Sequence, residues 1–113
     1  MKLPNKVKIG NHTVSIEERS REEIDNSYGR YRDRDLKIEI DKSLAPSMKA
    51  ATLVHELLHV CFLRAAIGQV MSTKYKDFSG DDEETIVRAL EEPVSYMIGH
   101  NPKLIAYLQE NIE

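Results

Sequence analysis

Residues 51–65 read ATLVHELLHVCFLRA, and the two histidines in this stretch decide how the rest of the chain is interpreted. His55 and His59 are four residues apart, which places both imidazoles on one helix face, about one turn from each other. Two imidazoles at this spacing can bind a single metal ion. Zinc suits them because it accepts neutral histidine nitrogen at about 2.0–2.1 Å in a tetrahedral site with one position left for water. The spacing therefore predicts a zinc site.

Glu56 follows the first histidine directly, and this position predicts a role on the water instead of on the metal. Its carboxylate projects beside the two imidazoles, where it can accept a proton from a metal-bound water. The neighbouring side chains are apolar on nearly every side, which predicts a buried helix. Because an unpaired imidazole or carboxylate in such a helix costs free energy, a bound zinc ion is the natural partner.

Length and composition indicate one domain over residues 1–113, large enough to form a core without disulfide or metal support. Any zinc is therefore expected to serve function more than folding. The lone Cys61 excludes an internal disulfide, and it lies half a turn away from the histidine face, so we expect a core residue and not a ligand.

Charge and hydropathy narrow the classes of partner. The net charge of −3 lacks the basic excess of a nucleic-acid-binding protein, so no nucleic acid is expected. No stretch reaches the eighteen or so apolar residues of a membrane span, so no membrane partner is expected either. The opening MKLPNKVKIG has no apolar signal-peptide region, which favours the cytosol as the compartment.

Alternating apolar residues predict the strands. They flank Gly10-Asn11 over residues 7–16, which indicates two short strands around a tight turn. Alternation returns in LKIEI at 36–40, with the apolar side chains inward and the charged ones on a solvated face. The charged residues 17–27 are compatible with either a helical turn or a loop.

Proline and glycine mark the helix ends. Pro46 suits the first turn of a helix of about twenty residues that contains HELLH and ends near Gly68. A second helix is expected from Asp81-Asp82 to Gly99, with a kink or a lost hydrogen bond at Pro93, and a short one from Pro102. The expected fold is α+β: a small antiparallel sheet packed on the HELLH helix, with a second helix that brings a third ligand.

A catalytic zinc site needs that third protein ligand from another element. The candidates are the carboxylates of the second helix and a histidine beyond it: Glu83, Glu84, Glu91, Glu92 and His100. Glu83 lies near the middle of that helix's apolar stripe, whereas Glu84 lies about 100° round, at its edge. An edge position suits a side chain that leaves the core and reaches a cleft.

Four motifs resemble a known family. YGRY at 28–31, TLVHELLHV at 52–60, DEETIVRALEEPV at 82–94 and HNP at 100–102 are similar to small phage- and prophage-encoded metallopeptidase-like proteins of the gluzincin type. These resemble the larger proteases that cleave prophage repressors. The resemblance implies a zincin-like fold, and it matches Glu84, three residues before Val87, to the third zinc ligand, with Glu83 as the alternative. Where the family shows Asp-Asn-Pro, this chain has His100-Asn101-Pro102.

The sequence thus predicts a zinc-dependent hydrolase of peptide bonds, with zinc held by His55, His59 and Glu84 and with Glu56 as general base. A peptide or protein is the expected substrate, because an extended chain can add to a strand edge beside the metal. The oxyanion stabiliser is left open among Tyr75, Tyr96, His100 and Tyr107. The alternative function is a zinc-bearing peptide-binding or phage assembly module that hydrolyses nothing.

Overall fold

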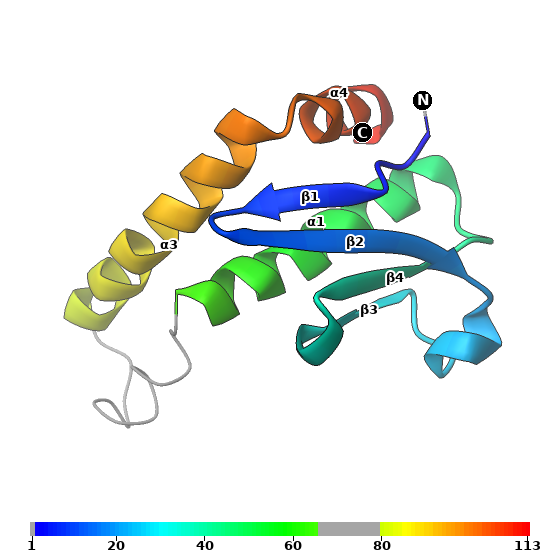
Figure 1. Ribbon diagram of the computed structural model, residues 1–113, viewed down its shortest axis with the longest axis horizontal. Helices are drawn as coiled ribbons and strands as arrows, with labels where there is room; N and C mark the ends of the chain where they lie inside the picture. The colour runs from blue at the N-terminus through cyan, green and yellow to red at the C-terminus, as the bar shows by residue number, and fades with distance from the viewer. Residues whose placement is uncertain (1, 66–79) are drawn as a thin grey trace.

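The computed structural model describes residues 2–65 and 80–113, and within these ranges the chain is α+β, as predicted. Four strands form one sheet, and three α-helices lie on one side of it (Figure 1). The strands are β1 (Lys6–Ile9), β2 (His12–Arg19), β3 (Gly29–Arg32) and β4 (Lys37–Asp41). Two 3-10 turns, η1 (Arg21–Ile24) and η2 (Asp33–Asp35), flank β3.

The sheet is mixed, so the expectation of an antiparallel sheet was wrong. Its strand order is β1-β2-β4-β3, with β1–β2 and β3–β4 antiparallel but β2–β4 parallel. The hairpin at Gly10, whose φ is +60°, was predicted correctly. After β2 the chain passes through η1 and β3 before β4 runs alongside β2, which leaves β3 at the edge. Alternation of side chains predicts strands but not their direction.

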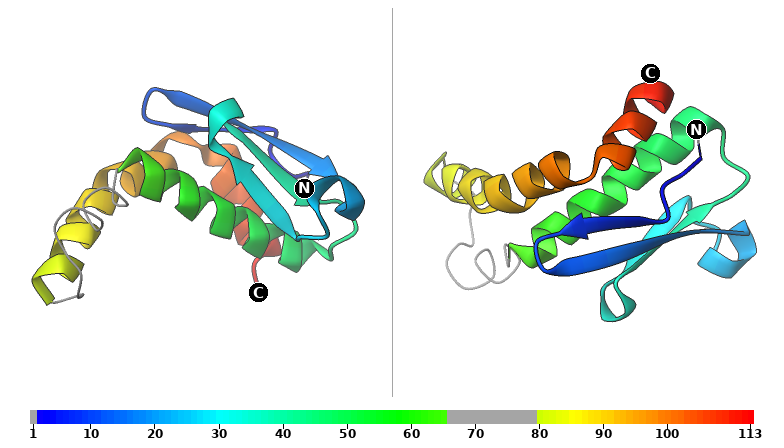
Figure 2. Two further views of the ribbon diagram at one scale, coloured as in Figure 1. Left: turned by 90° about the horizontal axis from the view of Figure 1, so that it is seen from below. Right: turned by 45° about the horizontal axis from the view of Figure 1, so that its top comes forward.

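The α-helices among the described residues are α1 (Pro46–Arg64), α3 (Gly80–His100) and α4 (Pro102–Asn111). The predicted starts at Pro46 and Pro102 are confirmed, and α3 begins one residue before the predicted Asp81. The predicted helix end at Gly68 lies outside the described residues. Figure 2 shows all three helices on the same side of the sheet, with α3 and α4 forming a corner.

The core lies between the sheet and α1. Apolar side chains of β1, β2 and β4 face those of α1 and α4, and all of the following are at most 4% exposed: Val7, Ile9, Val14, Ile16, Ile38, Ile40, Leu53, Leu57, Val60 and Leu104. Cys61 is buried among them, which confirms it as a core residue, and burial raises the pKa of its thiol.

Only one face of α1 is buried, so the expectation of a helix buried on all sides was wrong. Leu53, Leu57 and Val60 face the sheet, whereas His55 and His59 are exposed and Leu58 is 47% exposed. The sheet covers one side of α1. Helices α3 and α4 also contact α1, but they cover only part of its remaining surface. The histidine pair therefore lies on an accessible surface.

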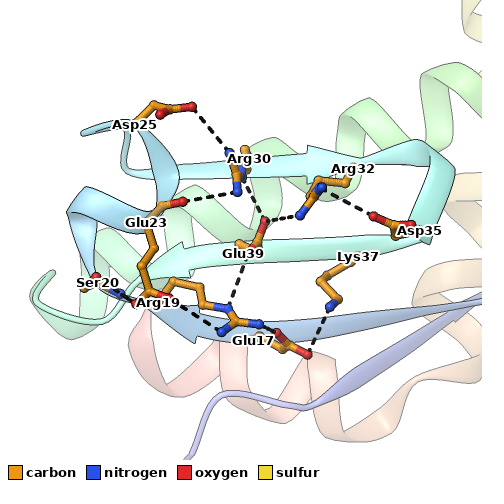
Figure 3. Close-up of polar contacts among 10 residues, drawn as sticks. All are labelled: Glu17, Arg19, Ser20, Glu23, Asp25, Arg30, Arg32, Asp35, Lys37 and Glu39. Atoms are coloured by element: carbon orange, nitrogen blue, oxygen red, sulfur yellow. Dashed lines mark hydrogen bonds and ion pairs between the residues drawn. The ribbon is translucent and has the colours of Figure 1, made fainter.

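The open face of the sheet is not simply solvated, as the charged residues of 36–40 had suggested. Glu39 is 4% exposed, and its carboxylate lies 2.8 Å from Arg30 Nε and 3.3 Å from Arg19 Nε, with Arg32 Nη1 at 3.9 Å (Figure 3). Glu17 and Arg30 are the cross-strand neighbours of Glu39 in the β2–β4 and β3–β4 registers. Arginines from two neighbouring strands thus cover a carboxylate and bury it.

Candidate metal centre

The two histidines of α1 converge. His55 Nε2 lies 3.2 Å from His59 Nε2, and the rings are nearly perpendicular at 81°. Two nitrogens bound at about 2.0–2.1 Å to one tetrahedral zinc ion are separated by about 3.3 Å, so this distance fits a shared ion. The same distance is compatible with a hydrogen bond from one imidazole to the other. With the His55 side chain 67% exposed, the pair is open to an ion from solvent.

Glu56 has the opposite surroundings from its histidine neighbours. It is 6% exposed, and its Oε2 lies 3.9 Å from His55 Nε2. Among the described residues, no side chain or backbone group donates a hydrogen bond to this carboxylate. Buried carboxylates usually have a donor, because desolvation without one costs free energy. The position beside the converging nitrogens is where a water molecule would satisfy it.

Glu56 lies against the edge strand. A Cβ atom added at Gly29, the first residue of β3, would lie 3.7 Å from Glu56 Cγ and 2.7 Å from Thr52 Cγ2. Glycine at this position therefore allows the backbone of β3 to approach α1 closely. Sequence reasoning placed Gly29 in a motif but gave it no role, since a close approach leaves no signal in a single sequence.

A polar cluster fixes the other end of β3 to α1. Arg64, the last residue of α1, contacts Asp33 through Nη2 at 2.6 Å, and the Tyr31 hydroxyl donates to the same Asp33 oxygen at 2.7 Å. Burial raises the pKa of Tyr31, with the hydrogen bond to Asp33 adding to the shift, so the hydroxyl stays protonated and keeps donating. Sequence analysis missed this cluster, whose partners are up to 33 positions apart.

The structure does not bring a predicted third ligand to the histidine pair. Glu83 and Glu84 are exposed, and Glu84 accepts a hydrogen bond from Arg88 Nε at 2.9 Å. The first turns of α3 lie beyond the C-terminal end of α1 (Figures 1 and 2). Within residues 2–65 and 80–113, no three His, Cys, Asp or Glu side chains are grouped to hold an ion. Glu83 is exposed although the sequence places it near the middle of the apolar stripe of α3, and the nearby Val87 is 55% exposed.

The oxyanion candidates are spread over the fold. Tyr107 is a core residue, 3% exposed, and Tyr96 stacks on His100 with ring centroids 3.9 Å apart at the far end of α3. Tyr75 lies outside the described residues. None of these contacts joins a described candidate to His55 or His59. The choice of oxyanion stabiliser therefore stays open.

Comparison with known proteins gives no relative from which a function could be inferred, so the functional argument depends on the site residues themselves. No family model, no curated protein and no solved structure matches this chain. Among the described residues, no helix combines the length and apolar character that crossing a membrane needs.

Proposed function

We propose that this chain is a zinc-dependent peptidase in which His55 and His59 bind the metal, Glu84 completes the protein ligands and Glu56 is the general base. The observation that carries the proposal is the buried Glu56 carboxylate, which has no hydrogen-bond donor among the described residues and lies beside two converging imidazole nitrogens. A buried acceptor next to an open metal position is the arrangement that base catalysis on water needs.

The histidine pair fits zinc by distance and by donor type. Bound zinc would polarise a peptide carbonyl and lower the pKa of a water ligand toward about 7. Glu56 would accept the proton from the attacking water and then deliver it to the leaving amine nitrogen.

The edge strand supports a peptide as the substrate. β3 pairs with β4 on one side only, so its other edge is free of strand partners in the described part of the chain. Its first residue packs beside Glu56, and the Arg64–Asp33–Tyr31 cluster fixes its far end to α1. An extended peptide that hydrogen-bonds to this edge would run along α1, past the general base.

Glu84 can act as the third ligand only if the fold changes. This role requires the first turns of α3 to come closer to the histidine pair than they lie in this structure. Glu84 would give up its exposed ion pair with Arg88, whose partners are 61% and 75% exposed. Such a pair on a helix surface stabilises by about 0.3–0.5 kcal/mol, which zinc ligation exceeds easily.

Glu56→Gln tests the proposal. We expect zinc binding and the folded state to be retained while hydrolysis of a peptide library falls by about 10²–10⁴-fold, because the amide cannot accept the proton. Glu22→Gln, on an exposed residue of η1, is the matched control and should hydrolyse as the wild type does. Equal activity in Glu56→Gln and wild type would refute the mechanism. If wild type and Glu56→Gln both bind zinc and peptide but neither cleaves the peptide, the chain is a zinc-bearing binding module and not a peptidase.

A further inference from the structure

A hollow lies at the other edge of the sheet, between β1 and the corner where α3 meets α4. Its volume is about 470 Å³, within the range of about 300–1,000 Å³ that small-molecule sites occupy. Lys6 and Lys8 of β1 form one wall, and His100, at the end of α3, and Lys103, in the first turn of α4, form the other. None of His55, Glu56, His59 and Glu84 lines it.

The lining of this hollow, which we call the lysine hollow, has a single sign of charge. Three ammonium groups and one imidazole border it, and none of the ten lining residues is an aspartate or glutamate. Across residues 2–65 and 80–113, none of these three lysines forms an ion pair with a carboxylate. In a chain with a net charge of −3, such a concentration of unpaired cations marks a site of positive potential.

The walls of the lysine hollow are fixed to each other. Asn101 Oδ1 accepts a hydrogen bond from the Lys8 amide at 2.8 Å, and its Nδ2 donates to the Lys8 carbonyl at 2.7 Å. The same Nδ2 donates to the Met97 carbonyl at 2.8 Å, and His100 stacks on Tyr96. One side chain thus joins β1 to the α3–α4 corner, so the backbone segments that carry Lys8 and Lys103 are fixed to each other before any ligand arrives.

We propose that the lysine hollow binds a small anion with a chain of phosphate groups. Lysines on an edge strand commonly serve only to block strand pairing, and this would explain Lys6 and Lys8 alone. It does not explain Lys103 and His100, which reach the same space from another part of the fold. Several cations around one concave space match a compact polyanion, to which lysine binds as a point charge.

A nucleic-acid strand matches the lysine hollow less well. Single-stranded nucleic acid is bound along a groove with aromatic side chains on which bases stack. The lining includes no tyrosine or phenylalanine, and the His100 ring already stacks on Tyr96.

Titration of the metal-free full chain with inorganic tripolyphosphate, followed by calorimetry, tests this proposal. Metal-free protein is used because polyphosphate also binds zinc. We expect saturable binding at one site that weakens about tenfold or more in Lys8→Glu and in Lys103→Glu, since each removes a charge-assisted contact. Lys42→Glu makes the same charge change on an exposed residue of the turn after β4, and it should bind within about twofold of the wild type.

Three results would overturn the proposal. The first is no saturable binding at millimolar tripolyphosphate. The second is equal weakening in Lys42→Glu, which would show a response to net charge alone. The third is tighter binding of a single-stranded oligonucleotide than of tripolyphosphate at the same ionic strength, with the same dependence on Lys8 and Lys103.

Discussion

Gly29 and Thr52 lie so close together that a methyl group at Gly29 would be 2.7 Å from Thr52 Cγ2. The same methyl group would be 3.1 Å from the Glu39 carbonyl oxygen, which belongs to the backbone of β4. The edge strand is thus packed directly on α1 at the turn that precedes the histidine pair. This contact positions both β3 and the buried Glu56.

Gly29→Ala should therefore destabilise the protein. The added methyl group overpacks the β3–α1 contact, which typically costs about 1–3 kcal/mol and would lower the urea midpoint. Gly99→Ala is the matched control, because a Cβ there meets no atom within 4 Å and alanine is favoured in a helix. A urea midpoint of Gly29→Ala equal to that of the wild type would show that the close approach has no energetic consequence.

Stability should fall in acid partly through Asp41. This carboxylate is fully buried, and hydrogen bonds from the Ser43 hydroxyl and amide, with Arg21, lower its pKa to about 2. An unfolded aspartate has a pKa of about 3.9, so the stabilisation is complete above about pH 4 and is lost as the pH falls toward 2. Asp41→Asn should therefore differ most from the wild type in urea midpoint at pH 6, and the difference should shrink by pH 2.

Ser43→Ala provides the control for this dependence. It removes the hydroxyl, the first cause of the lowered pKa, so the Asp41 contribution to stability should be smaller, and its loss should be complete at a higher pH, than in the wild type. A difference between Asp41→Asn and wild type that stays constant from pH 6 to pH 2 would show that the Asp41 charge does not stabilise the fold.

Zinc affinity should depend on Glu84 more than on Glu83. Glu84→Gln replaces the proposed third ligand with an amide and should weaken zinc binding strongly, whereas Glu83→Gln should change it little, because the two residues are about 100° apart round α3. Arg88→Ala should not weaken zinc binding, since it only removes the exposed partner of Glu84. Competition with a chromogenic chelator measures all three, and the reverse ranking of Glu83 and Glu84 would show that the phase of α3 was misjudged.

Much of the local structure was predictable because single residues determine it. Gly10 permits the turn between β1 and β2, and prolines begin α1 and α4 where a missing amide proton costs nothing. The convergence of His55 and His59 follows from helix geometry, and the structure shows it. The role of that pair in binding zinc remains a prediction.

What could not be predicted depends on contacts between distant parts of the chain. Alternation in LKIEI cannot reveal that β4 runs parallel to β2, nor that arginines from β2 and β3 bury Glu39. The residue spacing along α3 gives the direction in which Glu84 points around the helix axis. It does not give the distance between the start of α3 and α1.

The zinc content of the purified chain tests the central claim most directly. Metal-free protein is dialysed against micromolar zinc, and bound zinc is measured by elemental analysis in the wild type, His55→Ala and His59→Ala. His12→Ala, which changes an imidazole on β2, is the matched control. We expect one zinc ion per chain in the wild type and in His12→Ala, and none in the other two variants. No bound zinc in the wild type, or equal zinc in all four proteins, would contradict the account.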